Sequence, residues 1–154
     1  MILVVAIGGY FVSSLSLRGP SKDVCLGFKD IKNTYCDSKY GFALHYPESY
    51  KEANSYAVDE VVFMDGPRYI TVYAETGPNS CHLNLCDRAA TSHEIYNGVT
   101  WDFLGPANAC DGDASGGGCN MDDVFRTKNQ HGTIYIQSTS RSESENILKT
   151  FRFI

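Results

Sequence analysis

Hydrophobic and polar residues alternate along much of the chain, which is the two-residue period of strands that bury one face. The pattern is clearest in residues 40–47 (YGFALHYP), where Phe42, Leu44 and Tyr46 share one face. Proline has no N–H to donate to a neighbouring strand, so Pro47 ends this element. We therefore predict a half-buried strand here, with the later strands forming a sheet beside it.

Turn residues between further alternating segments predict β-hairpins. Asn97-Gly98 is the strongest of these signals, because both residues tolerate the positive φ angles of a two-residue turn. The three predicted hairpins join residues 61–64 to 69–75, residues 93–96 to 99–105, and residues 124–127 to 133–139. Residues 105–123 are rich in glycine and acidic residues and are predicted to form a long loop.

One of these strands raises a functional question, because Tyr69, Thr71 and Tyr73 alternate with Ile70 and Val72. If the tyrosine face is uncovered, its aromatic rings form a surface for a sugar or a partner protein. If another segment covers it, the tyrosines stabilise the sheet by cross-strand pairing.

The C-terminal region predicts one helix and a last strand. Ser142 and Glu145 have the spacing of a capping box, so we expect a helix from about Glu143 to Lys149. Ile147 and Leu148 would pack it on the sheet. The predicted fold class is α+β: an antiparallel sheet of about six or seven strands with one C-terminal helix packed on it.

The N-terminal residues 1–17 (MILVVAIGGYFVSSLSL) form the only long apolar run. As a helix they would span about 25 Å. We predict a signal or anchor helix that provides membrane attachment; an uncleaved anchor, a cleaved signal peptide and a buried core helix remain open. Residues 18–39 are predicted to be a linker and a cysteine-stapled loop, and residues 40–154 the α+β domain.

Composition limits the possible functions. The chain has 154 residues, 43% of them hydrophobic, which is enough for one packed domain and a leader. The formal net charge is −5, and no cluster of lysine and arginine is present. We therefore expect no binding to nucleic acid, which requires clustered positive charge.

The cysteine count of six is even, which predicts disulfides and an oxidising compartment. We predict pairing between cysteines that are neighbours in the sequence, because each pair closes a short segment. The alternative is six reduced cysteines in a cytosolic protein. The predicted disulfides are Cys25–Cys36, Cys81–Cys86 and Cys110–Cys119.

Three segments together resemble the PsbP-like domain of short exported or lipid-anchored bacterial proteins. They are residues 40–47 (YGFALHYP), residues 70–73 (ITVY) and residues 147–153 (ILKTFRF). The resemblance covers roughly residues 40–154 and implies the fold alone, because these are packing motifs. The resemblance implies a non-catalytic accessory or structural module, or a member with no known role. The departure lies at residues 76–92, where the family usually has a longer amphipathic helix.

Residues 111–122 predict a calcium site, because their oxygen-bearing side chains follow the ligand spacing of a calcium-binding loop. Two features argue against calcium: the Asp side chain at the twelfth position is short for bidentate binding, and no helices flank the loop. The alternative is a solvated acidic loop. The predicted ligands are Asp111, Asp113, Ser115 and Asp122.

Other combinations of residues are weaker signals. The zinc hypothesis has loose ligand spacing and would use Cys81, His82, Cys86 and His93. His45 is interpreted as a surface or half-buried residue rather than a general base. No nucleophile motif, phosphate-binding loop or dinucleotide fingerprint is present, so no catalytic residue and no further cofactor is predicted.

These observations lead to an expected function. We expect an extracytoplasmic, membrane-tethered or secreted domain, not an enzyme, that interacts with an envelope or surface protein. Two alternatives remain: a secreted hydrolase with an unrecognised site, and a pilin-like surface subunit that uses residues 1–17 as an assembly helix.

Overall fold

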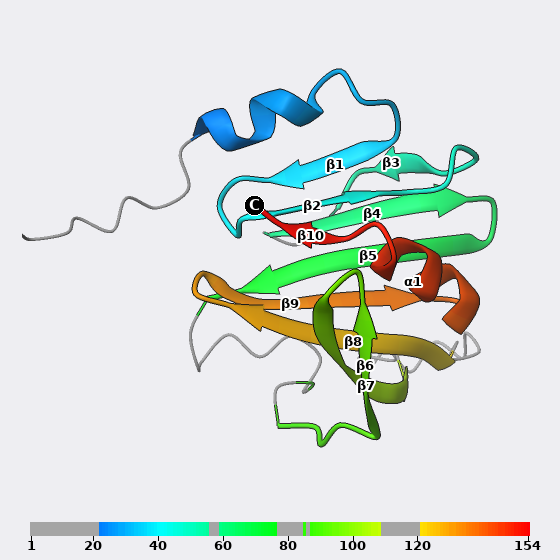
Figure 1. Cartoon of the computed structure of the whole chain (residues 1–154). Helices are drawn as coiled ribbons and strands as arrows, with labels where there is room; N and C mark the ends of the chain where they lie inside the picture. The colour runs from blue at the N-terminus through cyan, green and yellow to red at the C-terminus, as the bar shows by residue number, and fades with distance from the viewer. Residues whose placement is uncertain (1–21, 56–58, 77–84, 86, 109–120) are drawn as a thin grey trace, which may run out of the picture.

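The computed structural model describes residues 22–55, 59–76, 85, 87–108 and 121–154 (Figure 1). Within them lie ten strands, one α-helix and one 3-10 helix. The elements are η1 (Lys22–Phe28), β1 (Thr34–Asp37), β2 (Phe42–His45), β3 (Lys51–Ala53), β4 (Glu60–Asp65), β5 (Arg68–Glu75), β6 (Ser92–Tyr96), β7 (Val99–Asn108), β8 (Met121–Asn129), β9 (Gly132–Ser138), α1 (Arg141–Leu148) and β10 (Arg152–Phe153).

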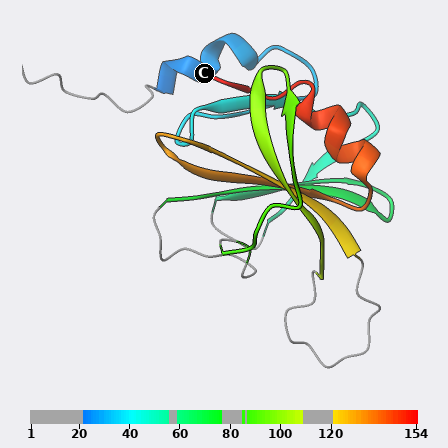
Figure 2. The same cartoon turned by 60° about the horizontal axis from the view of Figure 1, so that its bottom comes forward.

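The described strands form two antiparallel sheets. The larger has seven strands in the order β3-β4-β5-β9-β8-β7-β6, and the smaller has the order β1-β2-β10. The smaller sheet and α1 cover one face of the larger sheet (Figure 2). We call this the inner face and the opposite one the outer face.

The predicted role of the first strand was wrong in one respect. It was expected to start the main sheet, yet β2 lies in the smaller sheet between β1 and β10. The reason is that Phe42, Ala43 and Leu44 are all buried, so β2 uses both of its faces for packing.

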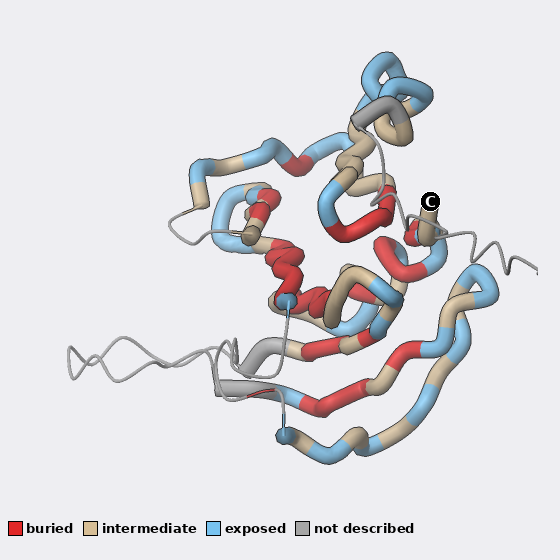
Figure 3. The backbone as a smooth tube through the Cα atoms, turned by 90° about the vertical axis from the view of Figure 1, so that its left-hand side faces the viewer, coloured by how far each residue is buried: buried red, intermediate tan, exposed pale blue. Residues whose placement is uncertain are grey.

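The core lies between the two sheets, where buried residues concentrate (Figure 3). It is strongly aromatic: the ring centroids of Phe42 and Phe151 lie 5.3 Å apart, and those of Trp101 and Phe151 lie 4.8 Å apart. The predicted inward residues of β7, β9 and α1 belong to it. These are Val99, Trp101, Phe103, Ile134, Ile136, Ile147 and Leu148.

The three predicted hairpins are present as β4–β5, β6–β7 and β8–β9. Asn97 and Gly98 have φ angles of 48° and 77°, as a two-residue turn of this kind requires. The predicted long loop is shorter than expected, because β7 continues to Asn108 and β8 begins at Met121. A β-bulge lies between Phe103 and Gly105.

The helix starts earlier than the predicted capping box. The N-cap is Ser140, whose side chain accepts a hydrogen bond from the backbone N–H of Glu143. The prediction placed the cap at Ser142, but Ser140 and Glu143 have the same spacing. Beside this cap, the buried hydroxyl groups Ser138 Oγ and Ser144 Oγ lie 2.7 Å apart and join β9 to α1.

Residues 22–39 are more ordered than a linker. β1 pairs in register with β2, from Thr34 opposite His45 to Asp37 opposite Phe42. The predicted disulfide Cys25–Cys36 is present, with a Cα–Cα distance of 5.7 Å, and it ties η1 to β1. Residues 1–17 lie outside the described residues. In the part that is described, no helix is both long and apolar enough to cross a membrane.

Candidate functional site

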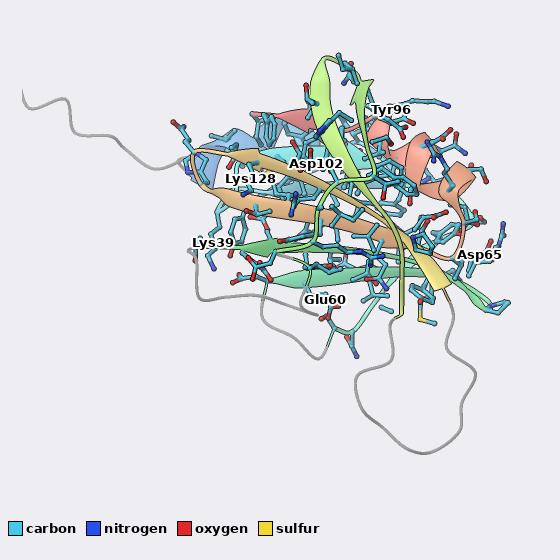
Figure 4. All side chains as sticks on the ribbon, turned by 90° about the horizontal axis from the view of Figure 1, so that it is seen from below. Lys39, Glu60, Asp65, Tyr96, Asp102 and Lys128 are labelled. Atoms are coloured by element: carbon cyan, nitrogen blue, oxygen red, sulfur yellow. A yellow bond between two sulfur atoms is a disulfide. The ribbon has the colours of Figure 1, made fainter. Side chains whose placement is uncertain are left out.

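The outer face of the larger sheet carries a continuous row of polar and aromatic side chains. Each member is directly opposite the next on the neighbouring strand, because the five strand registers coincide along one line. We call this the transverse row; from β4 to β6 it consists of Glu60, Tyr73, Tyr135, Arg126, Asp102 and His93. Glu60 and Asp102 are labelled in Figure 4, which views the molecule from below.

The charged end of the row is a chain of three groups. Arg126 donates from Nη2 and Nε to Asp102 Oδ2, at 2.7 Å and 3.1 Å. Asp102 Oδ1 lies 2.8 Å from His93 Nδ1. Burial alone would raise the pKa of Asp102, but the hydrogen bonds from Arg126 and His93 hold it below its ordinary value.

Arg126 also attaches a neighbouring segment to the outer face. Its Nη1 donates to the carbonyl oxygens of Leu85 and Arg88, at 3.4 Å and 3.3 Å. Leu85 is buried against Leu104 and Val124. Leu85 therefore covers part of the outer face, and the guanidinium group of Arg126 holds it there.

The middle of the row is a stacked tyrosine pair. The rings of Tyr73 and Tyr135 have centroids 4.8 Å apart and planes 10° apart. Tyr73 and Thr71 are only 4% and 8% exposed, so of the two alternatives for this strand the covered one is confirmed. Burial, with the charge of Glu75, raises the pKa of Tyr135 to about 12.

A hollow with a volume of about 520 Å³ lies next to Tyr135, at the β8–β9 turn. One wall is rigid, because Asn129 Oδ1 accepts hydrogen bonds from the backbone N–H groups of His131 and Gly132. A Cβ at Gly132 would lie 2.2 Å from the carbonyl oxygen of Glu75, so the close approach of β9 to β5 requires glycine. The lining residues are Glu75, Thr76, Asp87, Lys128, Asn129, Gln130, His131, Gly132, Thr133 and Tyr135.

A second charged cluster joins α1 to β6 on the inner side. Arg141 donates from Nη2 to Glu94 Oε1 at 2.6 Å and from Nε to Glu145 Oε1 at 2.9 Å. Tyr96 donates to Glu94 Oε2 at 2.6 Å. Burial and this hydrogen bond raise the pKa of Tyr96 to about 12. Arg141 also lies over the ring of Phe103, so it closes the core at this edge.

Most of the predicted metal ligands lie outside the described residues, so both metal sites stay predictions. For calcium these are Asp111, Asp113 and Ser115, while the backbone of Asp122 is in β8, opposite Ala107, rather than in a loop. For zinc they are Cys81, His82 and Cys86, and for the remaining disulfides Cys81–Cys86 and Cys110–Cys119. Among the described residues, no group of three or more His, Cys, Asp or Glu side chains could hold a metal ion.

The two described histidines that were considered have structural partners. His93, the fourth member of the zinc hypothesis, is in the transverse row. His45 Nδ1 lies 2.7 Å from Thr34 Oγ1, across the β1–β2 pair. His45 also donates its backbone N–H to Thr150 Oγ1 at 3.0 Å. These contacts agree with the half-buried interpretation.

Comparison with solved structures identifies the architecture. The solution structure of cyanobacterial PsbP (CyanoP) from Synechocystis sp. PCC 6803 matches with a TM-score of 0.52 and 16% identity, covering 79% of this chain and 91% of that one. The protein has a PsbP-like fold. A crystal structure from Bacteroides thetaiotaomicron VPI-5482 matches with the same TM-score, the same identity and the same coverage of this chain. That protein is longer, and this chain spans about half (48%) of its length.

Sequence comparison adds no narrower assignment to the PsbP-like fold. No protein-family model matches the chain, and no curated protein matches it. The resemblance in the two end motifs and one middle strand is therefore confirmed as a likeness of fold.

The transverse row of this PsbP-like sheet was not predicted from the sequence. One pair of the row could have been predicted, because a two-residue turn at Asn97-Gly98 fixes the register that places His93 opposite Asp102. The same reasoning at the β8–β9 turn places Arg126 opposite Tyr135. No motif pattern contains these pairs, since their members lie 9 residues apart.

Proposed function

We propose that the chain is a non-catalytic, extracytoplasmic module, tethered to a membrane or secreted, that binds an envelope or surface protein. The Cys25–Cys36 disulfide supports an oxidising compartment, where such bonds persist. The transverse row supports a non-catalytic role, because Asp102 and Arg126 are engaged with each other and with the backbone.

The observation that carries this proposal is the outer surface of β6. Ile95 is 74% exposed, the highest value for a large hydrophobic residue in the described part of the chain. The side chain of His93, two residues earlier on the same face, is 70% exposed. β6 ends the strand order of its sheet, so its second edge has no partner among the described strands. An extended segment of a partner protein can pair with such an edge, with Ile95 as an apolar anchor.

Photo-crosslinking in the native host tests this surface. A photoreactive amino acid at position 95 is expected to crosslink one envelope or surface protein, and Ile95→Asp is expected to abolish the complex without lowering stability. The matched control is position 31, since Ile31 is also an exposed isoleucine, at 43%, and lies outside the sheet. Equal crosslinking at both positions, or an unchanged complex with Ile95→Asp, would contradict the proposal.

The compartment is tested separately with an alkylating reagent. Intact cells are treated with a membrane-permeant thiol reagent before lysis, without reductant. Cys25 and Cys36 should stay unlabelled if the domain matures in an oxidising compartment, and become labelled if it resides in the cytosol. Peptide mass analysis reads the two cysteines individually.

The hydrolase alternative is favoured by one contact, the 2.8 Å pair of His93 Nδ1 and Asp102 Oδ1. Such a pair orients a general base in many active sites. In the described residues, however, no hydroxyl or thiol donates a hydrogen bond to His93. Ester or amide hydrolysis that disappears in His93→Ala would establish this alternative and replace the proposal. The pilin-like alternative depends on residues 1–17, outside the described part.

A further inference from the structure

We propose that the hollow beside Tyr135 binds a small zwitterion, a free amino acid or a short peptide, with its carboxylate on Lys128 and its ammonium on Asp87. This site is separate from the β6 surface, so it goes beyond the protein contact proposed above. Lys128 is labelled on β8 in Figure 4.

The first argument is charge. Lys128 and Asp87 line the same hollow, and no ion pair joins them. Neither forms an ion pair with any other residue in the described part of the chain. Two opposite charges that line one space without meeting are complementary to a ligand that carries both charges.

The second argument is shape and preorganisation. A volume of about 520 Å³ is within the usual range of small-ligand sites. The turn that forms the wall is fixed, because Asn129 accepts two backbone hydrogen bonds and donates from Nδ2 to the carbonyl oxygen of Tyr40 at 2.7 Å. Gln130 and Thr133 add neutral donors and acceptors, which suit the amide groups of a peptide.

Other ligand classes fit this lining less well. A sugar usually stacks on an exposed aromatic face, but Tyr135 is buried and its ring is stacked on Tyr73. A simple anion would meet the carboxylates of Glu75 and Asp87, and a simple cation would meet the ammonium of Lys128. A zwitterion satisfies both signs of charge at once.

Titration of the full-length chain, followed by amide NMR shifts, tests the proposal. The probes are glycine, diglycine and triglycine, each with an N-acetylated and a C-amidated form, because each residue lengthens the charge separation by about 3.5 Å. We expect one zwitterion to shift the amides of residues 128–133, and both of its blocked forms to bind at least about tenfold more weakly. Equal binding of zwitterion and blocked forms, or no binding of any zwitterion below about 10 mM, would overturn the proposal.

Two variants assign the ends of the ligand. In Lys128→Met the zwitterion and its C-amide should bind equally, and in Asp87→Asn the zwitterion and its N-acetyl form should do so. Lys51→Met is the matched control, because Lys51 is an exposed lysine on β3, at the far edge of the sheet, with no ion pair among the described residues. If Lys128→Met or Asp87→Asn leaves the preference for the zwitterion unchanged, the assignment is wrong.

Discussion

The two faces of the seven-stranded sheet differ in how they are stabilised. On the inner face, rings such as those of Trp101, Phe125 and Phe151 pack into one core under the small sheet and α1. On the outer face, Arg126 on β8 donates hydrogen bonds to Asp102 on the neighbouring strand β7. The comparison shows that one sheet can use non-directional packing on one side and directional hydrogen bonding on the other.

This difference has consequences for function. Apolar burial scales with area and tolerates few polar groups, so the inner face is committed to folding. Partly exposed ion pairs contribute less free energy, but they position side chains accurately at a surface. The outer face therefore carries the two surfaces that we propose for binding, the strand β6 and the hollow beside Tyr135.

The largest expected effect on stability comes from removing the ring of Phe151 from the core on the inner face. This ring contacts Phe42, Trp101 and Phe153 and is fully buried. Phe151→Ala should lower the free energy of unfolding by about 3–5 kcal/mol, measured by urea denaturation. Phe28→Ala is the control, since Phe28 is half-buried under Arg152; an equal loss in both variants would contradict a specific role for the core.

The next effect concerns the sheet that covers the inner face. Cys25→Ser with Cys36→Ser removes a crosslink that closes a separation of 11 residues. We expect a loss of about 2–3 kcal/mol in the free energy of unfolding, because the unfolded chain gains conformational freedom. Urea denaturation of the double variant without reductant measures it. A loss below about 0.5 kcal/mol would show that η1 and β1 do not depend on this bond.

A smaller effect is expected on the outer face at Arg126. Arg126→Met should cost about 1–2 kcal/mol, because Asp102 and two carbonyl groups lose a donor at a partly exposed site. Limited proteolysis should then cut residues 87–91 faster, since Arg126 holds this segment. Lys128→Met, on the same face of β8, is the control and should change stability by less than about 0.5 kcal/mol. Equal proteolysis of both variants would contradict this role of Arg126.

The smallest expected effect is on how the free energy of unfolding depends on pH, through Asp102 in the transverse row. The pKa of Asp102 is lower in the folded state than in the unfolded state, so the stabilisation is complete above the unfolded value of about 4 and is lost as pH falls through the folded pKa. Asp102→Asn should therefore flatten the decline of stability below about pH 4, by less than about 1 kcal/mol. Denaturation series at several pH values measure the difference. An unchanged slope would show that Asp102 has an ordinary pKa.

The sequence predicted the local parts of this fold well. Hairpins and inward-facing residues follow from alternation and from turns such as Asn97-Gly98, since both depend on neighbours in the chain. The assignment of β2 to the second sheet could not be predicted, because its partners β1 and β10 are separated by most of the chain. The cap at Ser140 was missed because two serines offered the same spacing.

The candidate site was predictable only in pieces. The hairpin turns fix the pairs His93–Asp102 and Arg126–Tyr135. Joining them into one row requires the pairing of β7 with β8, whose register shifts at a bulge after Phe103. It also requires the non-local pairing of β5 with β9. Such registers are set by packing of the whole sheet, which no local pattern reports.

A double-mutant cycle tests the central claim most directly: that the charged end of the row is a structural ion-pair network. The free energy of unfolding is measured for the wild type, Asp102→Asn, Arg126→Met and the double variant at neutral pH. Because Arg126 donates twice to Asp102, we predict a coupling energy of at least about 1 kcal/mol. Effects that add within about 0.3–0.5 kcal/mol would contradict the account, because the two side chains would then contribute independently.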